Sequence, residues 1–326
     1  MTIPPADPPH PVIAIVGPTA SGKSALALSI SENFQGEIVN YDSVQIYRHL
    51  DIGSAKPSLA ERTRVPHHMI DIREPGEVFT AGDYQREARA VLDDLRRRGR
   101  LPVLVGGTGL YLRALTEGLF AGPTRSIHWR VRFESLAERH GREYLHRLLR
   151  RLDPVAAERI MPRDTPKIIR ALEVRMETGK TLSEHLALEP RQPLSGFEIH
   201  TFGLNPPREE LGQRIDERVR LMFENGFVEE VQSLIRRGIP ASAPVMGAIG
   251  YRHILEKSQS STTWDATISM IQRDTRRYAK RQWTWFRKSK RTLWFDGFGD
   301  NPDISNEIRR KIQLLLPRWS QRTTAF

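Results

Sequence analysis

The sequence contains no cysteine among its 326 residues. This absence excludes disulfide bonds, cysteine-ligated zinc, iron–sulfur clusters and thiol nucleophiles, and it fits a reducing compartment. Long apolar runs are also missing: residues 12–16 form one of the longest, and it is far too short to cross a bilayer. The first eleven residues hold five prolines and no basic-then-apolar signal pattern. We therefore expect a flexible tail over 1–10, no membrane association and a cytoplasmic protein.

Charge is the strongest global feature of the sequence. Hydrophobic residues make up 39% and charged residues 27%, which is ordinary for a domain with a sizeable core. Lys and Arg, however, number 50 against 39 Asp and Glu, a formal net charge of +11. Such an excess favours a polyanionic partner such as nucleic acid, although a generally basic proteome would give the same number. The positions of the basic residues have to decide between the two.

Strand-like and helical segments alternate along the first 120 residues. The spacing of apolar residues there predicts strands at 12–16, 38–40, 68–72 and 101–105, and helices at 25–33, 81–98 and 110–116. Alternation of this kind is typical of an α/β fold with a parallel sheet and right-handed crossovers. We therefore predict a P-loop NTPase-like parallel sheet flanked by helices.

The pattern changes between residues 123 and 195. Strand runs vanish, and charged helix-forming sequence predicts helices within 131–151, 154–160 and 166–177. Strand and helix patterns then resume at 197–204, 207–224, 227–237, 265–289, 293–295 and 303–315. The expected organisation is a catalytic core of 11–122 and 196–326, interrupted by a small helical insertion domain at 123–195 that contacts the polyanion.

The segment 17–24 has the pattern G-x-x-x-x-G-K-S and stands between a predicted strand and a predicted helix. Backbone N–H groups of such a loop surround a phosphate, the helix N-terminus adds partial positive charge, and Lys23 adds a full one. The hydroxyl of Ser24 can bind Mg²⁺. The motif predicts a diphosphate or triphosphate ligand, without specifying the reaction, held by Gly17, Pro18, Thr19, Ala20, Ser21, Gly22, Lys23 and Ser24.

Two further segments fall at the carboxyl edge of the predicted sheet, where open α/β sheets bind their ligands. Asp42 is either a catalytic carboxylate or a turn aspartate that caps the following residues. In the run Gly106-Gly107-Thr108-Gly109, Thr108 either offers a hydroxyl to the same cleft or belongs to a tight glycine turn. His67 and His68 have no partner at metal-ligand spacing, and we interpret them as structural.

The segment 273–291 carries nine Lys or Arg, one acidic residue and the aromatic residues Tyr278, Trp283, Trp285 and Phe286. A solvated charged face normally mixes both signs. We therefore favour a phosphate-binding surface whose aromatic rings lie behind it or stack on bases. The segment 125–151 adds a second basic region, with eight arginines against three glutamates. Two basic regions indicate a long polyanion rather than a nucleotide.

With these motifs in view, the sequence resembles the tRNA dimethylallyltransferases, also called isopentenyl-diphosphate:tRNA transferases, from about residue 11 to 296. Eukaryotic members often carry an added zinc finger, so a chain without cysteine resembles the bacterial type. The resemblance rests on ordered blocks: GPTASGKS at 17–24, NYDSVQIYRHLDIGSAKP at 40–57, VPHHMIDIREP at 65–75, LVGGTGLYLRAL at 104–115, RDTPKIIRALEV at 163–174, RIDERVRLMFENGFVEEV at 214–231, MGAIGYR at 246–252 and KRQWTWFRK at 280–288.

The resemblance implies transfer of a dimethylallyl group from dimethylallyl diphosphate to N6 of adenosine 37, in tRNAs that read codons starting with U. It implies Asp42 as general base and Thr19 as a positioning group. Lys23 and Arg218, with Arg214 as the alternative to Arg218, would neutralise the leaving diphosphate together with Mg²⁺ at Ser24. The implied tRNA contacts are Asp42, Ser43, Val44, Gln45, Thr108, Arg130, Pro166, Lys167, Ile168, Ile169, Arg170, Gly247, Ala248, Ile249, Gly250, Tyr251, Arg252, Lys280, Arg281, Gln282, Trp283, Thr284, Trp285, Phe286 and Arg287.

Two alternatives remain open at this point. A P-loop small-molecule kinase would share the loop and the sheet, but it would leave the basic segment 273–291 without a purpose. An RNA-binding protein with a vestigial phosphate loop is the non-enzymatic alternative, and the intact side chains of Lys23, Ser24 and Asp42 argue against it. We expect a monomer, because no large apolar surface helix stands out.

Overall fold

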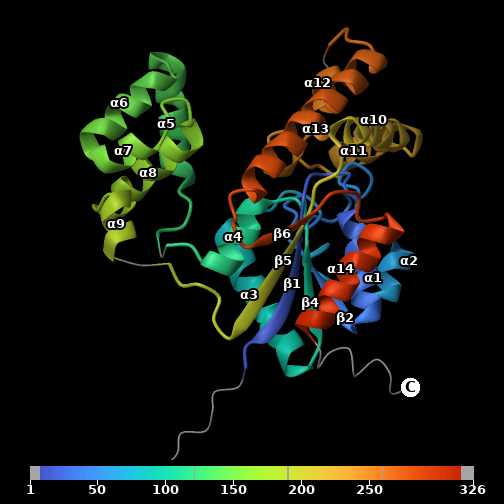
Figure 1. Cartoon of the computed structure of the whole chain (residues 1–326). Helices are drawn as coiled ribbons and strands as arrows, with labels where there is room; N and C mark the ends of the chain where they lie inside the picture. Colours follow the sequence, from blue (N-terminus) through green and yellow to red (C-terminus); the bar gives the residue numbers. More distant parts are fainter. Residues whose placement is uncertain (1–7, 121, 189–190, 259, 317–326) are drawn as a thin grey trace, which may run out of the picture. The chain divides into compact units, whose positions relative to one another are not determined.

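The computed structural model describes residues 8–120, 122–188, 191–258 and 260–316, so residues 1–7 of the expected tail lie outside the described residues. These residues form two compact units (Figure 1). The larger unit runs to Leu115 and resumes at Leu194, and the smaller one spans Thr116–Pro193. Within the described ranges, no helix combines the length and the apolar character that a membrane span requires.

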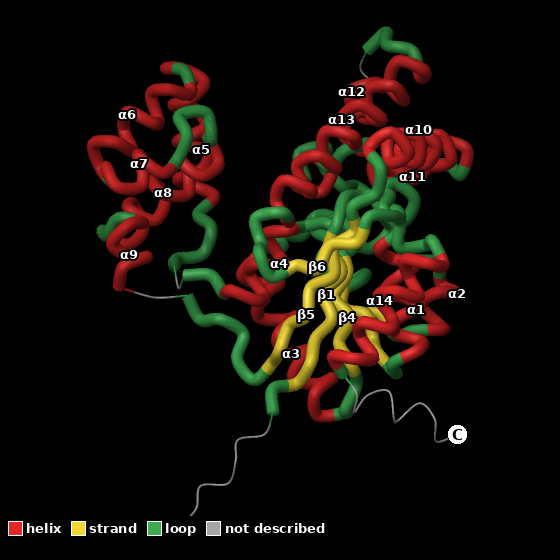
Figure 2. Tube along the Cα trace, viewed as in Figure 1, coloured by secondary structure: helices red, strands yellow, loops and turns green. Residues whose placement is uncertain are grey.

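The larger unit is built on a parallel sheet, drawn in yellow in Figure 2. The sheet has six strands in the order β3-β2-β4-β1-β5-β6. Ile13 of β1 pairs with Val103 on one side and with His200 on the other, so β1 lies inside the sheet. The predicted α/β fold class is confirmed. The strands are β1 His10–Val16, β2 Gly36–Asn40, β3 His67–His68, β4 Leu101–Val105, β5 Phe197–Leu204 and β6 Thr292–Phe295.

Alternation along β1 explains how both faces of the sheet are covered. Val12, Ala14 and Val16 point to one face, where they join the core residues of α3 (Ala81–Arg97) and α4 (Gly109–Glu117). Ile13 and Ile15 point to the other face, toward α1 (Lys23–Asn33) and α14 (Pro302–Leu315). Burial of each such large apolar side chain stabilises the fold by about 1.5–3 kcal/mol. The strand ends that follow are thus fixed from both sides.

The helices between β5 and β6 lie beyond the carboxyl edge of this sheet (Figure 2). They are α10 Arg208–Glu224, α11 Phe227–Arg236, the short 3₁₀ helix η1 Pro244–Gly247, α12 Tyr251–Ser258 and α13 Trp264–Phe286. The predicted helices at 207–224, 227–237 and 265–289 are found within three residues at each end. The sequence patterns did not predict η1, α12, or the short helix α2 (Leu59–Arg64) before β3.

The predicted strand at 68–72 is wrong beyond its first residue. Only His67 and His68 pair with β2. Met69 and Asp71 then adopt φ angles of 61° and 55°, a left-handed conformation that cannot continue a strand. His67 Nδ1 lies 2.7 Å from the carbonyl oxygen of Val65, and His68 Nε2 lies 2.7 Å from the Glu37 carboxylate. Both histidines therefore have partners within the protein, as a structural role requires.

The smaller unit is a helical bundle with its own core of Phe133, Leu145, Leu149, Ile168 and Leu172. Within the predicted helical segment 131–151 the structure has two helices, because Gly141 has a φ angle of 79° and ends the first. The helix α9 was not predicted. The helices are α5 Ile127–His140, α6 Arg142–Leu152, α7 Pro154–Arg159, α8 Thr165–Thr178 and α9 Leu182–Leu188.

A buried carboxylate ties the start of α5 to α8 in this unit. Glu173 has no exposed side-chain surface, and it accepts hydrogen bonds from the Ser126 backbone N–H, Arg130 at 3.1 Å and Arg170 at 3.0 Å. Burial acts to raise the pKa of Glu173. The Ser126 N–H and the guanidinium groups of Arg170 and Arg130 outweigh it and hold that pKa below its usual value.

Replacing Glu173 by Ala should destabilise the helical unit by about 3 kcal/mol, because two guanidinium groups lose their buried partner. Urea unfolding followed by helix circular dichroism measures this, with Glu177→Ala on the exposed side of the same helix as the control. Since the pKa of Glu173 is depressed in the folded state, its contribution is present at neutral pH and is lost as pH falls through that lowered value. An equal effect of both substitutions would contradict this assignment.

Candidate active site

The phosphate-loop segment connects β1 to α1 in the larger unit. Gly17, Ala20 and Gly22 have φ angles of 148°, 63° and 82°, and the helix starts at Lys23. Gly22 leaves no room for a side chain, since a Cβ there would lie 2.7 Å from the backbone nitrogen of Asp300. The loop therefore folds as its glycine spacing predicts and presents the N-terminus of α1 at the carboxyl edge of the sheet.

Lys23 is buried beneath this loop, where its Nζ donates a 2.6 Å hydrogen bond to the carbonyl oxygen of Pro18. Burial and then the neighbouring Arg218 charge lower the pKa of Lys23 to about 7, against the opposing effect of Asp42. An anion bound in the loop would favour the charged amine and raise this pKa again. The lysine is thus placed to gain a proton when an anionic ligand arrives.

Asp42 follows β2 at the carboxyl edge of the sheet. Its Oδ1 accepts hydrogen bonds from the backbone N–H groups of Val44 at 2.9 Å and Gln45 at 3.4 Å, so it does order the turn. The same carboxylate also lines the cavities described below. Burial raises the pKa of Asp42 above its usual value, despite the opposing backbone N–H groups and the Lys23 charge. A more basic carboxylate is a better proton acceptor near neutral pH.

The glycine loop 106–109 brings α13 against the strand ends. A Cβ on Gly107 would lie 2.7 Å from Gln282 Nε2 and 2.8 Å from Asp42 Oδ2, and a Cβ on Gly109 would overlap the ring of Trp285. Only glycine allows these approaches. The carbonyl oxygen of Gly107 accepts hydrogen bonds from Gln282 Nε2 at 2.9 Å and from the Tyr278 hydroxyl at 3.2 Å.

Thr108 joins the glycine loop to the loop after β2. Its Oγ1 accepts a 2.9 Å hydrogen bond from the Ser43 backbone N–H and donates a 3.0 Å bond to the Ser43 hydroxyl. Both loops follow neighbouring strands of the sheet, so this pair fixes their separation. The Thr108 hydroxyl is therefore engaged within the protein rather than directed freely into the cleft.

Two cavities adjoin at this edge of the sheet, with volumes of about 330 Å³ and 510 Å³. The smaller one is lined by the phosphate loop and by polar and charged side chains, Lys56 and Asp300 among them. The larger one is lined mainly by apolar side chains, including Val44, Phe79 and Met222. The residues that line both are Thr19, Asp42, Ser54, Ala55, Arg218 and Tyr278. Asp42 therefore stands where a polar and an apolar compartment meet.

Arg218, and not Arg214, faces these cavities. Arg214 is held elsewhere, because its Nη1 bonds both carboxylate oxygens of Asp300 at 2.9 and 2.7 Å and its guanidinium lies 3.7 Å above the Phe298 ring. Burial lowers the pKa of Arg218 from its high ordinary value, and an arginine remains charged at neutral pH. A fixed positive charge thus acts on Lys23 and lines the same two cavities as Asp42.

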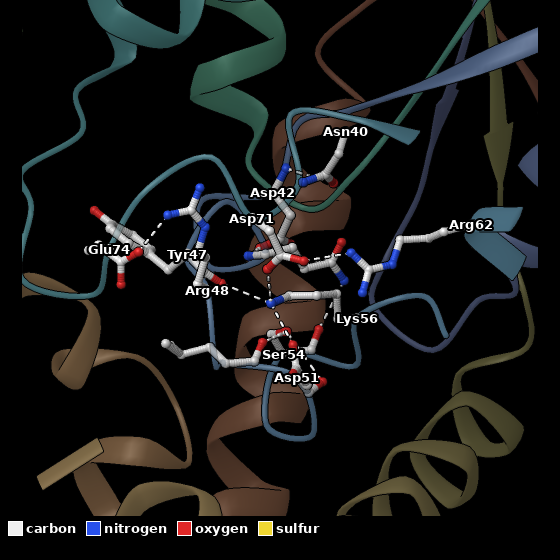
Figure 3. A network of polar contacts seen from close by, with 12 residues as sticks. Asn40, Asp42, Tyr47, Arg48, Asp51, Ser54, Lys56, Arg62, Asp71 and Glu74 are labelled. Atoms are coloured by element: carbon white, nitrogen blue, oxygen red, sulfur yellow. Dashed lines mark hydrogen bonds and ion pairs between the residues drawn. The ribbon is translucent and has the colours of Figure 1, made fainter. Parts of the chain in front are cut away.

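The segment after Asp42 is held by a buried lysine that the sequence patterns did not mark (Figure 3). The Lys56 side chain is 1% exposed, and its Nζ donates to the carbonyl oxygen of Tyr47 and to the carboxylates of Asp51 and Asp71 at 2.7–2.8 Å. Arg62 neutralises the second oxygen of Asp71 at 2.5 Å. This network closes the loop that forms one wall of the polar cavity.

A second anchor of the same segment is Glu230 of α11. Its carboxylate accepts hydrogen bonds from three successive backbone N–H groups, those of Asp51, Ile52 and Gly53, at 2.7–3.1 Å. It also accepts the hydroxyl of Tyr251 at 2.7 Å. In the sequence, Glu230 is marked only by its place within the block 214–231. The three backbone N–H groups that it binds lie 177–179 positions away along the chain.

The basic surface on α13 forms a shallow hollow of about 410 Å³ outside the two cavities. Its lining consists of Arg277, Lys280, Arg281, Thr284, Trp285 and Lys288. Arg113 of α4 lies 5.0 Å from the Trp285 ring, which is within range of a cation–π contact. Arg281 also lines the apolar cavity, so the hollow and that cavity share a wall.

Several residues expected to contact tRNA have buried side chains. In the larger unit these are Gln282, Phe286 and Tyr251, which pack inward. In the helical unit, Ile168 and Ile169 belong to the core, while Pro166 and Lys167 of the same helix are exposed. The side chains of Ile168 and Ile169 are thus unavailable to an RNA, which corrects that part of the expectation. The helix turns by about 100° per residue, which takes these two side chains into the core while Lys167 stays at the surface.

The remaining expected contacts divide between the surface and the cavities. Trp283 lies between the guanidinium groups of Arg208 and Arg287, at 4.7 and 4.5 Å from its ring. Arg252 is exposed, and Arg130 and Arg170 are held by Glu173. Gln45 lines the polar cavity. Gly250 has a φ angle of 93° and packs against the Phe227 ring. The expected contacts that line the apolar cavity are Ser43, Val44, Gly247, Ala248, Ile249, Tyr251 and Arg281.

Magnesium fits the polar cavity through the chemistry of its oxygen donors. The cavity is lined by the exposed Ser24 and by the carboxylates of Asp42 and Asp300. Mg²⁺ typically takes one or two protein oxygens and completes its shell with water and substrate phosphates. No cluster of three His, Asp or Glu side chains suited to a metal occurs in the described part of the chain. A metal here would therefore depend on the phosphate ligand and on water for most of its coordination.

The fold and the loop define this chain as an α/β protein of the P-loop type, and comparison with known proteins is more specific. The IPP transferase family model matches residues 45–289. A tRNA dimethylallyltransferase of Solibacter usitatus is 48% identical over 94% of this chain and 99% of its own length. One of Koribacter versatilis is 46% identical over 93% and 98%. The chain therefore belongs to the IPP transferase family of tRNA dimethylallyltransferases and is a prenyltransferase enzyme.

Solved structures agree with this family. The full-length tRNA isopentenylpyrophosphate transferase of Bacillus halodurans matches with a TM-score of 0.68 at 34% identity, over 97% of this chain and 98% of that one. A eukaryotic dimethylallyltransferase acting on tRNA matches with a TM-score of 0.78 at 26% identity, over 96% and 80%. The resemblance drawn from the sequence blocks is confirmed.

Replacing Glu230 by Gln should loosen the segment 51–53, because an amide offers one acceptor atom and turns an NH₂ group toward the remaining donors. Each lost hydrogen bond to a charged acceptor is worth about 1.5–3 kcal/mol, so exchange of these backbone amides should accelerate by roughly tenfold or more. Hydrogen exchange with mass spectrometry measures this, and Glu229→Gln, at the exposed neighbouring position, serves as the control. Unchanged protection in the Glu230 variant would show that the anchor is not needed.

Proposed function

We propose that this enzyme transfers a dimethylallyl group from dimethylallyl diphosphate to N6 of adenosine 37, in tRNAs that read codons starting with U. The observation that carries the proposal is the meeting of a polar and an apolar cavity at Asp42. One compartment suits a diphosphate and the other suits an apolar prenyl group and a base. The position and the tRNA class come from the family resemblance.

The division of labour follows from the charges around each cavity. The phosphate loop, Lys23 and Arg218 bind the diphosphate and stabilise the charge that develops on it as it leaves. Thr19, which lines both cavities, positions the allylic end. In a family that uses an allylic diphosphate, Mg²⁺ held at Ser24 would neutralise part of the same charge when bound.

The reaction exchanges one bond for another. The bond between N6 of the adenine and the allylic carbon forms, while the bond between that carbon and the diphosphate oxygen breaks. Asp42 takes the proton from N6, and the raised pKa of its carboxyl supports this role. The base leaves its stack in the anticodon loop to reach Asp42, which costs a few kcal/mol. Contacts between the tRNA and the protein offset that cost.

The tRNA is bound in this proposal by basic groups of both units. The hollow on α13 accepts the RNA backbone, and Trp285 adds an aromatic face. The flipped base is surrounded by residues at or beside the apolar cavity, from 42–45 and 247–252. Thr108 supports this wall through its hydrogen bond with Ser43. Arg130, Pro166, Lys167 and Arg170 contribute from the helical unit. The enzyme acts as a monomer in the cytoplasm, with tRNA as its macromolecular partner.

The direct test is incubation of undermodified tRNA with the protein, dimethylallyl diphosphate and Mg²⁺, followed by nuclease digestion and mass spectrometry. The proposal predicts N6-(dimethylallyl)adenosine at position 37 of tRNAs that read codons starting with U. A product at another position, or no product from a folded protein, would overturn it. Phosphorylation of a small molecule with ATP in place of the allylic diphosphate would favour the kinase alternative.

Replacing Asp42 by Asn should lower the single-turnover rate on bound tRNA by about 10²–10⁴-fold, the usual loss for a general base. The rate of the unchanged enzyme should rise with pH through a value above the ordinary aspartate pKa, because the base must be ionised. This dependence should vanish in the variant. Asp303→Asn, at an exposed position of α14 outside both cavities, is the control. Rescue of Asp42→Asn by high Mg²⁺ would instead make Asp42 a metal-orienting group.

Replacing both Lys280 and Arg281 by Ala should weaken tRNA binding and flatten its salt dependence. For every phosphate that the variant no longer neutralises, the slope of log affinity against log salt should fall by roughly 0.7–0.9. The matched control replaces Arg310 and Lys311 of α14, which removes the same charge from an exposed helix on another part of the unit. Filter binding across a salt series measures both. Equal slopes for the two double variants would show that the α13 cations are solvated and bind no phosphate.

A further inference from the structure

The side chain of Gln282 joins three segments that lie far apart in the sequence. It projects from α13 and is 5% exposed. Its Oε1 accepts a 2.7 Å hydrogen bond from the Thr19 backbone N–H in the phosphate loop, and its Nε2 donates a 2.9 Å bond to the carbonyl oxygen of Gly107. The partners are 263 and 175 positions away. A single amide thus fixes the distance between the two loops that follow β1 and β4.

The position between the Thr19 N–H and the Gly107 carbonyl requires a side-chain amide. The Thr19 N–H needs an acceptor and the Gly107 carbonyl needs a donor, and glutamine offers both at one end. A glutamate would accept from Thr19 but would repel the Gly107 carbonyl, and a leucine of similar size would leave both backbone groups unpaired. A Cβ on Gly107 would lie 2.7 Å from Gln282 Nε2, so this close contact requires glycine at position 107.

The outer side of the same helix carries the basic hollow. Lys280 and Arg281 immediately precede Gln282 and are exposed, whereas Gln282 points inward. A displacement of this helical turn moves the outer cations and the inner amide together, because helix backbone is rigid over one turn. Binding of RNA on the outside therefore constrains the place of Thr19, whose neighbours in the loop are the donors for the diphosphate.

We propose that Gln282 is a positioning residue that couples the two substrates: RNA bound on α13 orders the phosphate loop through this amide and tightens the binding of diphosphate. The inference rests on the proposed function for the identity of the two ligands. Because coupling between sites is reciprocal, diphosphate tightens the binding of RNA by the same factor. Gln282, expected from the sequence to contact tRNA, thereby acts from behind the RNA surface.

The experiment measures the dissociation constant of inorganic diphosphate with Mg²⁺ by calorimetry, with and without a saturating anticodon stem–loop RNA. In the unchanged protein, diphosphate should bind about tenfold tighter with RNA present, within the usual range of coupling between sites. In Gln282→Leu this ratio should fall to about one, while RNA binding without diphosphate stays within about threefold. If Gln282 had only a structural role, its replacement would weaken diphosphate binding equally with and without RNA. The ratio of the two dissociation constants would then stay unchanged.

Gln272→Leu is the matched control, since Gln272 lies on the same helix and also donates its side-chain amide to a backbone carbonyl, that of Asp216 at 3.0 Å. It lines neither the cavities nor the hollow, and its ratio should equal that of the unchanged protein. If Gln282→Leu does not fold, Gln282→Glu takes its place in the experiment. The glutamate keeps the acceptor for the Thr19 N–H but loses the donor to the Gly107 carbonyl, so the ratio of the two dissociation constants should be reduced.

A ratio of one in the unchanged protein, or a full ratio in the Gln282 variants, would overturn the inference. These outcomes are distinct from a failure of the proposed function, which would appear as absence of dimethylallyl transfer to tRNA by the unchanged enzyme. An enzyme that transfers the group with no coupling through Gln282 would keep its function and refute only this inference.

Discussion

The close approach of α13 to the glycine loop 106–109 is the constraint on which the site depends. Gly107 has no space for a Cβ, and its carbonyl receives the side chains of Tyr278 and Gln282. This contact brings a helix that starts at residue 264 to the ends of strands formed from the first third of the chain. The cavities exist because helices close over the sheet edge here.

Within that frame, charge determines what each cavity can do. Lys23, Arg218 and Asp42 share the boundary of the polar compartment. Arg218 lowers and Asp42 raises the pKa of Lys23, and the Lys23 charge in turn acts to lower the pKa of Asp42. The buried amine has its pKa lowered to about 7, and the buried carboxyl has its pKa raised. The ion pairs of Lys56, which lines the polar cavity, and the hydrogen bonds of Glu230 hold the wall of that cavity in place. Positioning and reactivity are thus assigned to different residues.

Local sequence patterns predicted most strands and helices of the fold. The site was harder to predict, because many of its contacts join residues that are far apart in the sequence. Strands 101–105 and 197–204 were predicted to the residue, because apolar runs between turns fix buried strands. Left-handed residues ended the strand predicted at 68–72. Gln282 was placed among the tRNA contacts by the family resemblance of the block 280–288, and a sequence block does not show which of its side chains point inward. Glu230 was missed, because its partners lie elsewhere in the chain.

The proposed function requires that Asp42 face the reacting amine while the phosphate loop holds the diphosphate. The most direct test is a crystal structure of the protein with inorganic diphosphate, Mg²⁺ and an anticodon stem–loop RNA. We expect adenine N6 within about 2.6–3.2 Å of the Asp42 carboxylate, the reach of a general base, with the diphosphate in the loop at 17–24. An adenine still stacked in its loop, or a diphosphate bound outside the phosphate loop, would contradict it.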